Sequence, residues 1–256
     1  MQIYFLGTGT SQGIPVIGSN HPVCKSKDDR DKRLRVSVWI VSNDTSIVID
    51  CGPDFRQQML TSGCNKLDAI LFTHEHADHT AGLDDIRPFN FFQNMPIPIY
   101  GHIRVLENLK ERFGYIFQTI DRYPGAPSVK TVEVKNNHHF KVGNTTVIPI
   151  NADHGGLQVF GYRIQDFAYL TDVKTIEHSE IEKLKGLKVL VINALREEAH
   201  YSHFNLQDAL DFIHLLQPEK TYLTHISHLM GFHEEVQQKL PDNVFLAYDN
   251  LKLSLY

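Results

Sequence analysis

Cysteine is scarce in this chain, and so are long apolar runs. The 256 residues contain only three cysteines (Cys24, Cys51 and Cys64), and this odd, sparse set argues against a disulfide framework. No uninterrupted apolar stretch reaches the roughly 20 residues that a membrane-spanning helix needs. Residues 1–6 have the pattern of a strand rather than of a basic segment followed by an apolar one, so we expect no secretory signal there. These absences predict a cytoplasmic protein that does not enter a membrane.

The chain also lacks an excess of positive charge. Lys and Arg total 25 against 30 for Asp and Glu, and the net charge is -5. Nucleic-acid backbones attract concentrated Lys and Arg, so nucleic acid is not the expected partner. The hydrophobic content of 42% is that of an ordinary globular protein, and no Pro-, Gly- or Ser-rich linker divides the chain. We therefore expect residues 1–256 to form a single domain.

Short apolar and β-branched runs predict strands in both halves of the chain. The expected strands cover residues 3–6, 36–41, 46–50, 69–73, 129–134, 146–150, 159–164, 168–170 and 188–192. Helices are expected over residues 54–62, 104–113 and 175–185, and after Asn205, whose side chain can cap a helix. Two strand-rich halves, each with helices, favour an α+β fold in which two sheets are flanked by helices.

Histidines are concentrated directly after the strand expected at 69–73. His74, His76, Asp78 and His79 place three imidazoles and a carboxylate within six residues. Imidazole and carboxylate are ordinary ligands for zinc, manganese and iron. His74 and His76 could share one ion while Asp78 and His79 reach a second. The alternative, a solvated histidine-rich loop, fits poorly with this density of ligands after a buried strand.

This cluster matches the H-x-H-x-D-H motif, and through it the chain resembles the metallo-β-lactamase superfamily. Three further ligands of that family follow apolar strands, and the matching positions are His154, Asp172 and His225. The resemblance implies a four-layer αββα sandwich that holds two divalent metal ions. It assigns the ligands of the two ions as follows: His74, His76 and His154 for one, Asp78, His79 and His225 for the other, with Asp172 bridging them.

Asp50 ends the strand expected at 46–50 and is followed closely by Gly52. It matches an aspartate that in this family holds a ligand imidazole in the right tautomer. A turn residue before a glycine is an equally good interpretation of the same position.

Residues 7–15 and 82–89 resemble the phosphodiesterase branch of the superfamily, which includes phosphoribosyl cyclic phosphate phosphodiesterase and, more distantly, the tRNA 3′-processing nucleases. The resemblance implies a metal-dependent hydrolase that uses zinc or manganese to cleave a small or cyclic phosphodiester. A tRNA-end nuclease, a lactone or thioester hydrolase of the same fold, and a metal-binding protein without activity are the alternatives. A homodimer is the default expectation for a soluble oligomer.

A histidine of the 193–203 segment is expected to serve catalysis. In the phosphodiesterase branch a histidine in this region faces the substrate phosphate and can protonate the leaving oxygen. His203 has the favoured spacing to His225, and His200 is the second choice, with packing beside the helix at Asn205 as its simpler interpretation. With Asp78, these two residues make up the expected catalytic set.

A third metal ion is a further expectation. Close phosphodiesterase relatives hold a structural zinc with C-x-C-x-x-C and a later histidine. Here His21 and Cys24 occupy two of the first three positions, Ser19 occupies the other, and His228 follows His225 at the expected interval. His21, Cys24 and His228 could still bind zinc, although a structural zinc normally takes four ligands.

Overall fold

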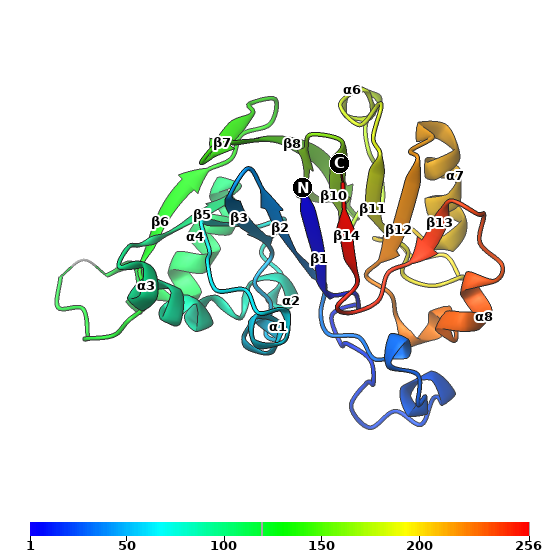
Figure 1. Ribbon diagram of the computed structural model, residues 1–256, viewed down its shortest axis with the longest axis horizontal. Coiled ribbons are helices and arrows are strands. Elements are labelled where there is room, and N and C mark those ends of the chain that lie inside the picture. The colour runs from blue at the N-terminus through cyan, green and yellow to red at the C-terminus, as the bar shows by residue number, and fades with distance from the viewer. Residues whose placement is uncertain (119, 256) are drawn as a thin grey trace.

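The computed structural model of the chain describes residues 1–118 and 120–255, which form two seven-stranded sheets (Figure 1). The first sheet has the spatial order β14 (Lys252–Ser254), β1 (Gln2–Gly7), β2 (Ser37–Ser42), β3 (Thr45–Ile49), β4 (Ala69–Leu71), β5 (Ile97–Gly101) and β6 (Val129–Glu133). The second has the order β13 (Val244–Leu246), β12 (Lys220–Thr224), β11 (Val189–Asn193), β10 (Phe167–Leu170), β9 (Leu157–Ile164), β8 (Thr145–His154) and β7 (Phe140–Val142).

Helices lie on the outer sides of both sheets. The α-helices are α1 (Phe55–Ser62), α2 (Ala77–Thr80), α3 (Arg87–Gln93), α4 (Ile103–Arg112), α5 (Gly114–Phe117), α6 (His178–Glu182), α7 (Leu206–Leu216) and α8 (His233–Gln237). Short 3₁₀ helices are η1 (Pro22–Lys25), η2 (Asp29–Asp31), η3 (Leu83–Ile86) and η4 (His228–Met230). Figure 1 shows α3 and α4 beside β5 and β6 on the left, and α7 beyond β12 on the right. Within the described residues, none of the helices combines the length and the apolarity needed to cross a bilayer.

Side chains of the central strands point alternately to the two faces of each sheet, and this explains why helices cover one face and the other sheet covers the other. On β3, Ile47 and Ile49 point into the core shared by the two sheets, whereas Val48 points into the core under α1 and α4. β11 behaves in the same way in the second sheet: Val191 faces the shared core, and Ile192 faces the core that contains the buried side of α7. Successive side chains of a strand point to opposite faces, so strands buried on both faces have continuous apolar sequences. The result is the αββα sandwich that the sequence predicted.

Parallel strands in each sheet end at the same edge. β3, β4, β5 and β6 pair in parallel, and so do β10, β11, β12 and β13. Because the carboxyl ends of parallel strands meet at one edge, the segments that follow β3 and β4 in one sheet lie together, as do those that follow β10 and β12 in the other. The predicted ligands His74, Asp172 and His225 all follow such strands.

The expected helix over 175–185 was too long. The structure has only α6, from His178 to Glu182, with turns up to Gly186. Thr175 instead forms an isolated antiparallel bridge with Asp153, the residue before His154. Pairing with the β8 edge keeps this segment extended until Glu177, so a helix cannot begin earlier. The other expected helices are present within one residue or so of their bounds. α7 begins at Leu206, and Asn205 caps it through a reciprocal capping box with Asp208.

Candidate metal centre

The H-x-H-x-D-H segment changes conformation in its middle. β4 is buried along its length, and the chain continues through the buried His74 to His76, where the short helix α2 begins. Thr80 closes this turn by donating its hydroxyl to the His76 carbonyl at 2.8 Å. The first two histidines therefore project from an extended segment, and Asp78 and His79 project from a helical turn.

Gly52 allows that turn to lie close to the end of β3. A Cβ atom on Gly52 would lie 2.0 Å from the carbonyl oxygen of Asp78, so no other residue fits without moving the backbone. The amide of Cys51 also donates to the His79 carbonyl at 2.8 Å. The segment after β3 thus fixes the backbone of two expected ligands.

Three site residues lie just beyond strands with a positive φ. Asp50 has φ 64°, Asp172 has φ 57° and His225 has φ 56°. Side chains other than glycine seldom adopt this left-handed conformation, and residues that do so cluster at functional sites. At each of these positions the left-handed residue redirects the chain at the carboxyl edge of its sheet.

Asp172 lies between the two sets of imidazoles. Its Oδ2 is 3.8 Å from Nε2 of His74 and 3.8 Å from Nε2 of His154. Its other oxygen, Oδ1, is 3.4 Å from Nε2 of His79 and 2.9 Å from Nδ1 of His225. The two carboxylate oxygens therefore face two different sets of imidazoles, as a bridging ligand requires.

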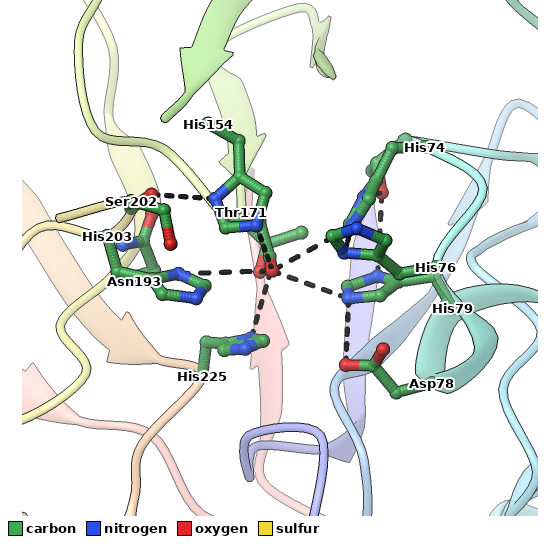
Figure 2. A network of polar contacts seen from close by, with 12 residues as sticks. His74, His76, Asp78, His79, His154, Thr171, Asn193, Ser202, His203 and His225 are labelled. Carbon is green, nitrogen blue, oxygen red and sulfur yellow. Dashed lines mark hydrogen bonds and ion pairs between the residues drawn. The ribbon is translucent and has the colours of Figure 1, made fainter. Parts of the chain in front are cut away.

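The donor atoms fall into groups small enough to surround an ion. One group, with all donor atoms within 4.8 Å of one another, contains His74, His76, His154 and Asp172. Another contains Asp78, His79 and His225. These are the two ligand sets that the resemblance implied, and Figure 2 shows their rings directed toward a common point.

Two of the proposed ligand imidazoles, those of His79 and His154, have a hydrogen-bond partner on the side of the ring that faces away from the centre. Asp50, fully buried, lies 2.7 Å from Nδ1 of His79, and accepts hydrogen bonds from the backbone amide and the hydroxyl of Thr73. Nδ1 of His154 is 2.6 Å from the carbonyl oxygen of Ser202. These contacts leave Nε2 of each ring facing the centre. The observed contacts of Asp50 favour the imidazole-holding interpretation over that of a simple turn residue.

At the centre, Nε2 of His79, Nδ1 of His203 and Nδ1 of His225 are buried and make no hydrogen bond of suitable geometry among the described residues. Nδ1 of His225 lies only 2.9 Å from Oδ1 of Asp172, but this contact lacks hydrogen-bond geometry. In addition, Nε2 of His74 and Nδ1 of His76 approach to 2.9 Å. Buried polar atoms normally have a partner, and imidazole and carboxylate donors suit zinc, manganese or iron. The residues present therefore fit a divalent metal.

The buried charges perturb the ionisation of the cluster. Burial alone would raise the pKa of Asp172, but His225 and His79 hold this pKa well below its usual value. Burial would lower the pKa of His79, whereas the carboxylates of Asp78, Asp172 and Asp50 raise it well above its usual value. A cation bound between these groups would replace the proton on His79, because metal binding and protonation compete for the same lone pairs.

His203 and His200 occupy different depths. The His203 ring lies 4.4 Å from that of His154 and 4.9 Å from that of His225, and its Nδ1 is 3.9 Å from Oδ2 of Asp172. The His200 ring lies outside it, at 5.1 Å from the His203 ring and 4.8 Å from Tyr201. Burial lowers the pKa of His203 to about 3, against the opposing effect of Asp172. The structure thus brings His203 to the centre and leaves His200 one ring further out.

The third expected site is incomplete. The rings of His21 and His228 lie 5.0 Å apart, and Nδ1 of each is buried without a hydrogen-bond partner among the residues that the structure describes. Cys24 does not complete the set: its sulfur accepts the amide of Val16 at 3.5 Å, and the three side chains are not among the groups of described residues whose donor atoms lie within 4.8 Å of one another. These residues do not fit a structural zinc as they stand. Cys24 lies in the 3₁₀ turn η1, which follows His21, and its amide donates to the His21 carbonyl at 3.0 Å.

The sequence analysis assigned no role to two residues that support the centre, Asn193 and Arg104. Asn193, at the end of β11, accepts the amide of Val173 at 2.7 Å and donates to its carbonyl at 3.0 Å, which fixes the chain beside Asp172. Arg104 contacts Glu75, which lies between His74 and His76. Such contacts join segments distant in sequence, so only the folded structure reveals them.

Comparisons with known proteins agree with this geometry. Residues 45–226 match the family described as beta-lactamase superfamily domain. A solved structure of a diphosphatase from the PhnP family is 39% identical, with a TM-score of 0.92 over 98% of this chain and 96% of that one. An octanoyltransferase of Porphyromonas gingivalis is 41% identical over 98% of this chain and 51% of its own length. A ribonuclease Z of Enterococcus faecalis is 30% identical over 74% of this chain and 54% of its own length. The chain thus spans about half the length of these two curated relatives.

Proposed function

Since the chain belongs to the metallo-β-lactamase superfamily and to its phosphodiesterase branch, we propose that it is a hydrolase that cleaves a small or cyclic phosphodiester at a centre of two divalent ions, zinc or manganese. One observation carries the proposal. Asp172 directs one carboxylate oxygen toward His74 and His154 and the other toward His79 and His225. A carboxylate placed in this way suits a pair of ions.

Different residues of the chain would bind each of the two ions. His74, His76 and His154 would hold one ion, and Asp78, His79 and His225 the other, with Asp172 between them. Two bound ions supply a hydroxide nucleophile near neutral pH and neutralise charge on a phosphoryl group. Asp50 and the Ser202 carbonyl keep Nε2 of His79 and His154 directed inward.

We assign proton donation to His203, with His200 as the second choice. His203 borders the ligands of both ions, and its Nδ1 faces the centre. A ring in this position can give a proton to the leaving oxygen as the phosphorus–oxygen bond breaks. A bound phosphate would favour the protonated ring, because its negative charge offsets the burial that lowers the pKa of His203.

Several observations support a small substrate. The diphosphatase relative shares nearly its whole length with this chain, and attack at phosphorus is common to diphosphates and phosphodiesters. The net charge of -5 disfavours a long phosphate backbone. The second candidate is an RNA 3′-end nuclease, and the similarity to ribonuclease Z favours it. The name octanoyltransferase belongs to a protein of which about half lies outside the match.

Two broader features are also proposals. We propose that residues 1–256 form one domain, because the two sheets share one core. The three cysteines are free, which suits the reducing cytoplasm, and a homodimer is the default assembly.

The test is an assay of the purified protein with measured metal content. The substrates are bis-p-nitrophenyl phosphate, a cyclic ribose phosphate, a dinucleoside diphosphate and a tRNA precursor. We expect metal-dependent cleavage of at least one of the small substrates and none of the tRNA precursor. Cleavage of the tRNA precursor alone would favour the nuclease, and bound metal without any phosphoryl cleavage would reject the phosphodiesterase.

The variant His203→Ala tests the proton donor. Turnover of an alkyl phosphodiester should fall by about 10²–10⁴-fold, the usual contribution of a general acid, with metal content unchanged. Turnover of the p-nitrophenyl ester should fall much less, because p-nitrophenolate leaves without a proton. His200→Ala is the matched control, and a larger loss in that variant would exchange the two assignments.

A further inference from the structure

We propose that Arg104 is a positioning residue that holds together the two segments supplying His74, His76 and His154. This inference rests on the proposed metal centre but not on the identity of its substrate. Three contacts carry it, and each connects helix α4 with one of the ligand-bearing segments.

Arg104 contacts, through Glu75, the loop that carries His74 and His76, which we call the ligand loop. Its Nε donates to Oε1 of Glu75 at 2.6 Å, and its Nη2 donates to Oε2 at 3.1 Å. Glu75 lies between His74 and His76, and its side chain is only 17% exposed. A two-point contact between guanidinium and carboxylate fixes orientation as well as distance.

The same Nη2 atom also binds the second segment. It donates to the backbone carbonyl of Gln158 in β9 at 2.6 Å. Gln158 pairs with Asp153 in the β8–β9 hairpin, and His154 pairs with Leu157 at the end of that hairpin. One guanidinium thus connects the loop of His74 and His76 with the hairpin of His154, although these segments belong to different sheets.

Helix α4 is itself well placed for this role. His102 caps its first turn by accepting the amide of Arg104 at 3.2 Å. At its other end, Arg112 donates to the Glu75 carbonyl at 3.1 Å and to the Thr80 hydroxyl at 2.8 Å. The ligand loop is therefore supported along α4 by two arginines, of which only Arg104 also reaches the hairpin.

A general structural ion pair would behave differently from a positioning contact. Removing it would lower the melting temperature but would leave the metal dissociation constants of the folded protein unchanged. Contacts behind the ligands typically change metal affinity by about 10–100-fold. Metal affinity therefore distinguishes the two roles, and it does so without any substrate.

The experiment measures zinc dissociation constants by competition with a chromophoric chelator, together with the melting temperature of the metal-free protein. In Arg104→Ala and in the isosteric Glu75→Gln, we expect one of the two ions to bind about 10–100-fold more weakly and the other to stay within about threefold. Arg104→Lys should keep part of the affinity, since it keeps the charge but not the two-point contact. The double variant should bind no more weakly than the weaker single variant.

Arg163→Ala is the matched control. Arg163 also lies in β9 and also donates to backbone carbonyls, those of Lys183 at 2.5 Å and Lys185 at 2.9 Å. It lies toward the end of the β8–β9 hairpin away from His154, and neither Lys183 nor Lys185 is next to a proposed ligand. This variant should lose stability and keep both affinities. Wild-type affinities in folded Arg104→Ala and Glu75→Gln would overturn the positioning role while leaving the metal centre intact. A wild-type protein that binds no zinc or manganese would overturn the centre, and the role of Arg104 with it.

Discussion

Within the described residues, the histidines of the metal centre form a complete set of metal donors, and those of the N-terminal corner do not. At the centre, seven proposed donor side chains from both sheets converge, with Asp172 between the other six. At the N-terminal corner, defined here by His21, Cys24 and His228, two imidazoles lie 5.0 Å apart without a third donor beside them. Both clusters have suitable residue types, so residue type alone does not decide which of them binds an ion.

The contacts behind the imidazoles separate the two clusters. His79 is held by Asp50 and His154 by the Ser202 carbonyl. At the corner, Nδ1 of His21 and Nδ1 of His228 have no hydrogen-bond partner among the described residues. A ring that is held from behind presents a fixed lone pair, and a ring without that contact does not. A metal site therefore depends on the contacts that orient its imidazoles as much as on the imidazoles themselves.

The largest effect should follow from Asp172→Ala. This change removes the carboxylate that faces both groups of imidazoles, so each of the two proposed ions would lose a ligand. We expect turnover to fall by on the order of 10³-fold or more, which corresponds to about 4 kcal/mol, with reduced metal content. Rate measurements and elemental analysis on the same samples would check this.

Asp166→Ala is the control for that variant. Asp166 directly precedes β10, the strand after which Asp172 follows, and its side chain lies 3.8 Å from the Lys188 ammonium, away from the centre. It should retain both metal and turnover. Full turnover in Asp172→Ala with two ions bound would show that the carboxylate does not bridge them.

A smaller effect is expected from Asp50→Asn, which keeps the shape of the side chain. The amide oxygen can still accept the Thr73 amide, and the amide nitrogen then faces Nδ1 of His79. Because that nitrogen donates, His79 would carry its proton on Nε2 and could not bind an ion there. We expect metal affinity to fall by about 10–100-fold, measured by chelator competition.

The corresponding control is Asp54→Asn. Asp54 forms an ion pair with Arg35 at 2.9 Å, and among the described residues its side-chain hydrogen bonds are all with Arg35. Its replacement should leave the metal affinity unchanged. An equal loss of affinity in both variants would mean that general destabilisation, and not the tautomer of His79, explains the result.

The sequence was most informative where function depends on contiguous residues or on strand ends. The runs that became β3, β4 and β11 were recognisable because both of their faces are buried, and the ligands followed directly after such runs. Together with the resemblance to the metallo-β-lactamase superfamily, these runs predicted the fold and the two proposed groups of donors. The strands β5, β13 and β14 were not predicted, because, unlike β3, β4 and β11, each has partly exposed residues and so lacks a run buried on both faces.

What could not be predicted depends on contacts between distant segments. Arg104 lies 29 residues from Glu75 and 54 from Gln158, and nothing in its own neighbourhood marks it. The early start expected for the helix at 175 was wrong because Thr175 pairs with Asp153, a contact that local propensity does not contain. The corner was expected to be a zinc site because its spacing is right, but spacing along the chain does not ensure that Cys24 reaches the two histidines.

The smallest effect is expected at the corner, from His228→Ala. The ring contributes no hydrogen bond through its buried Nδ1, so its loss should change stability by no more than about 1 kcal/mol. The number of zinc ions per chain and the affinity of the centre should stay at wild-type values in this variant and in Cys24→Ala. Loss of one zinc per chain in both variants would mean that the corner closes around an ion, with Cys24 moving toward His21 and His228. In that case supporting contacts would be less decisive than the comparison implies, because an ion would have organised a site that the chain alone leaves open.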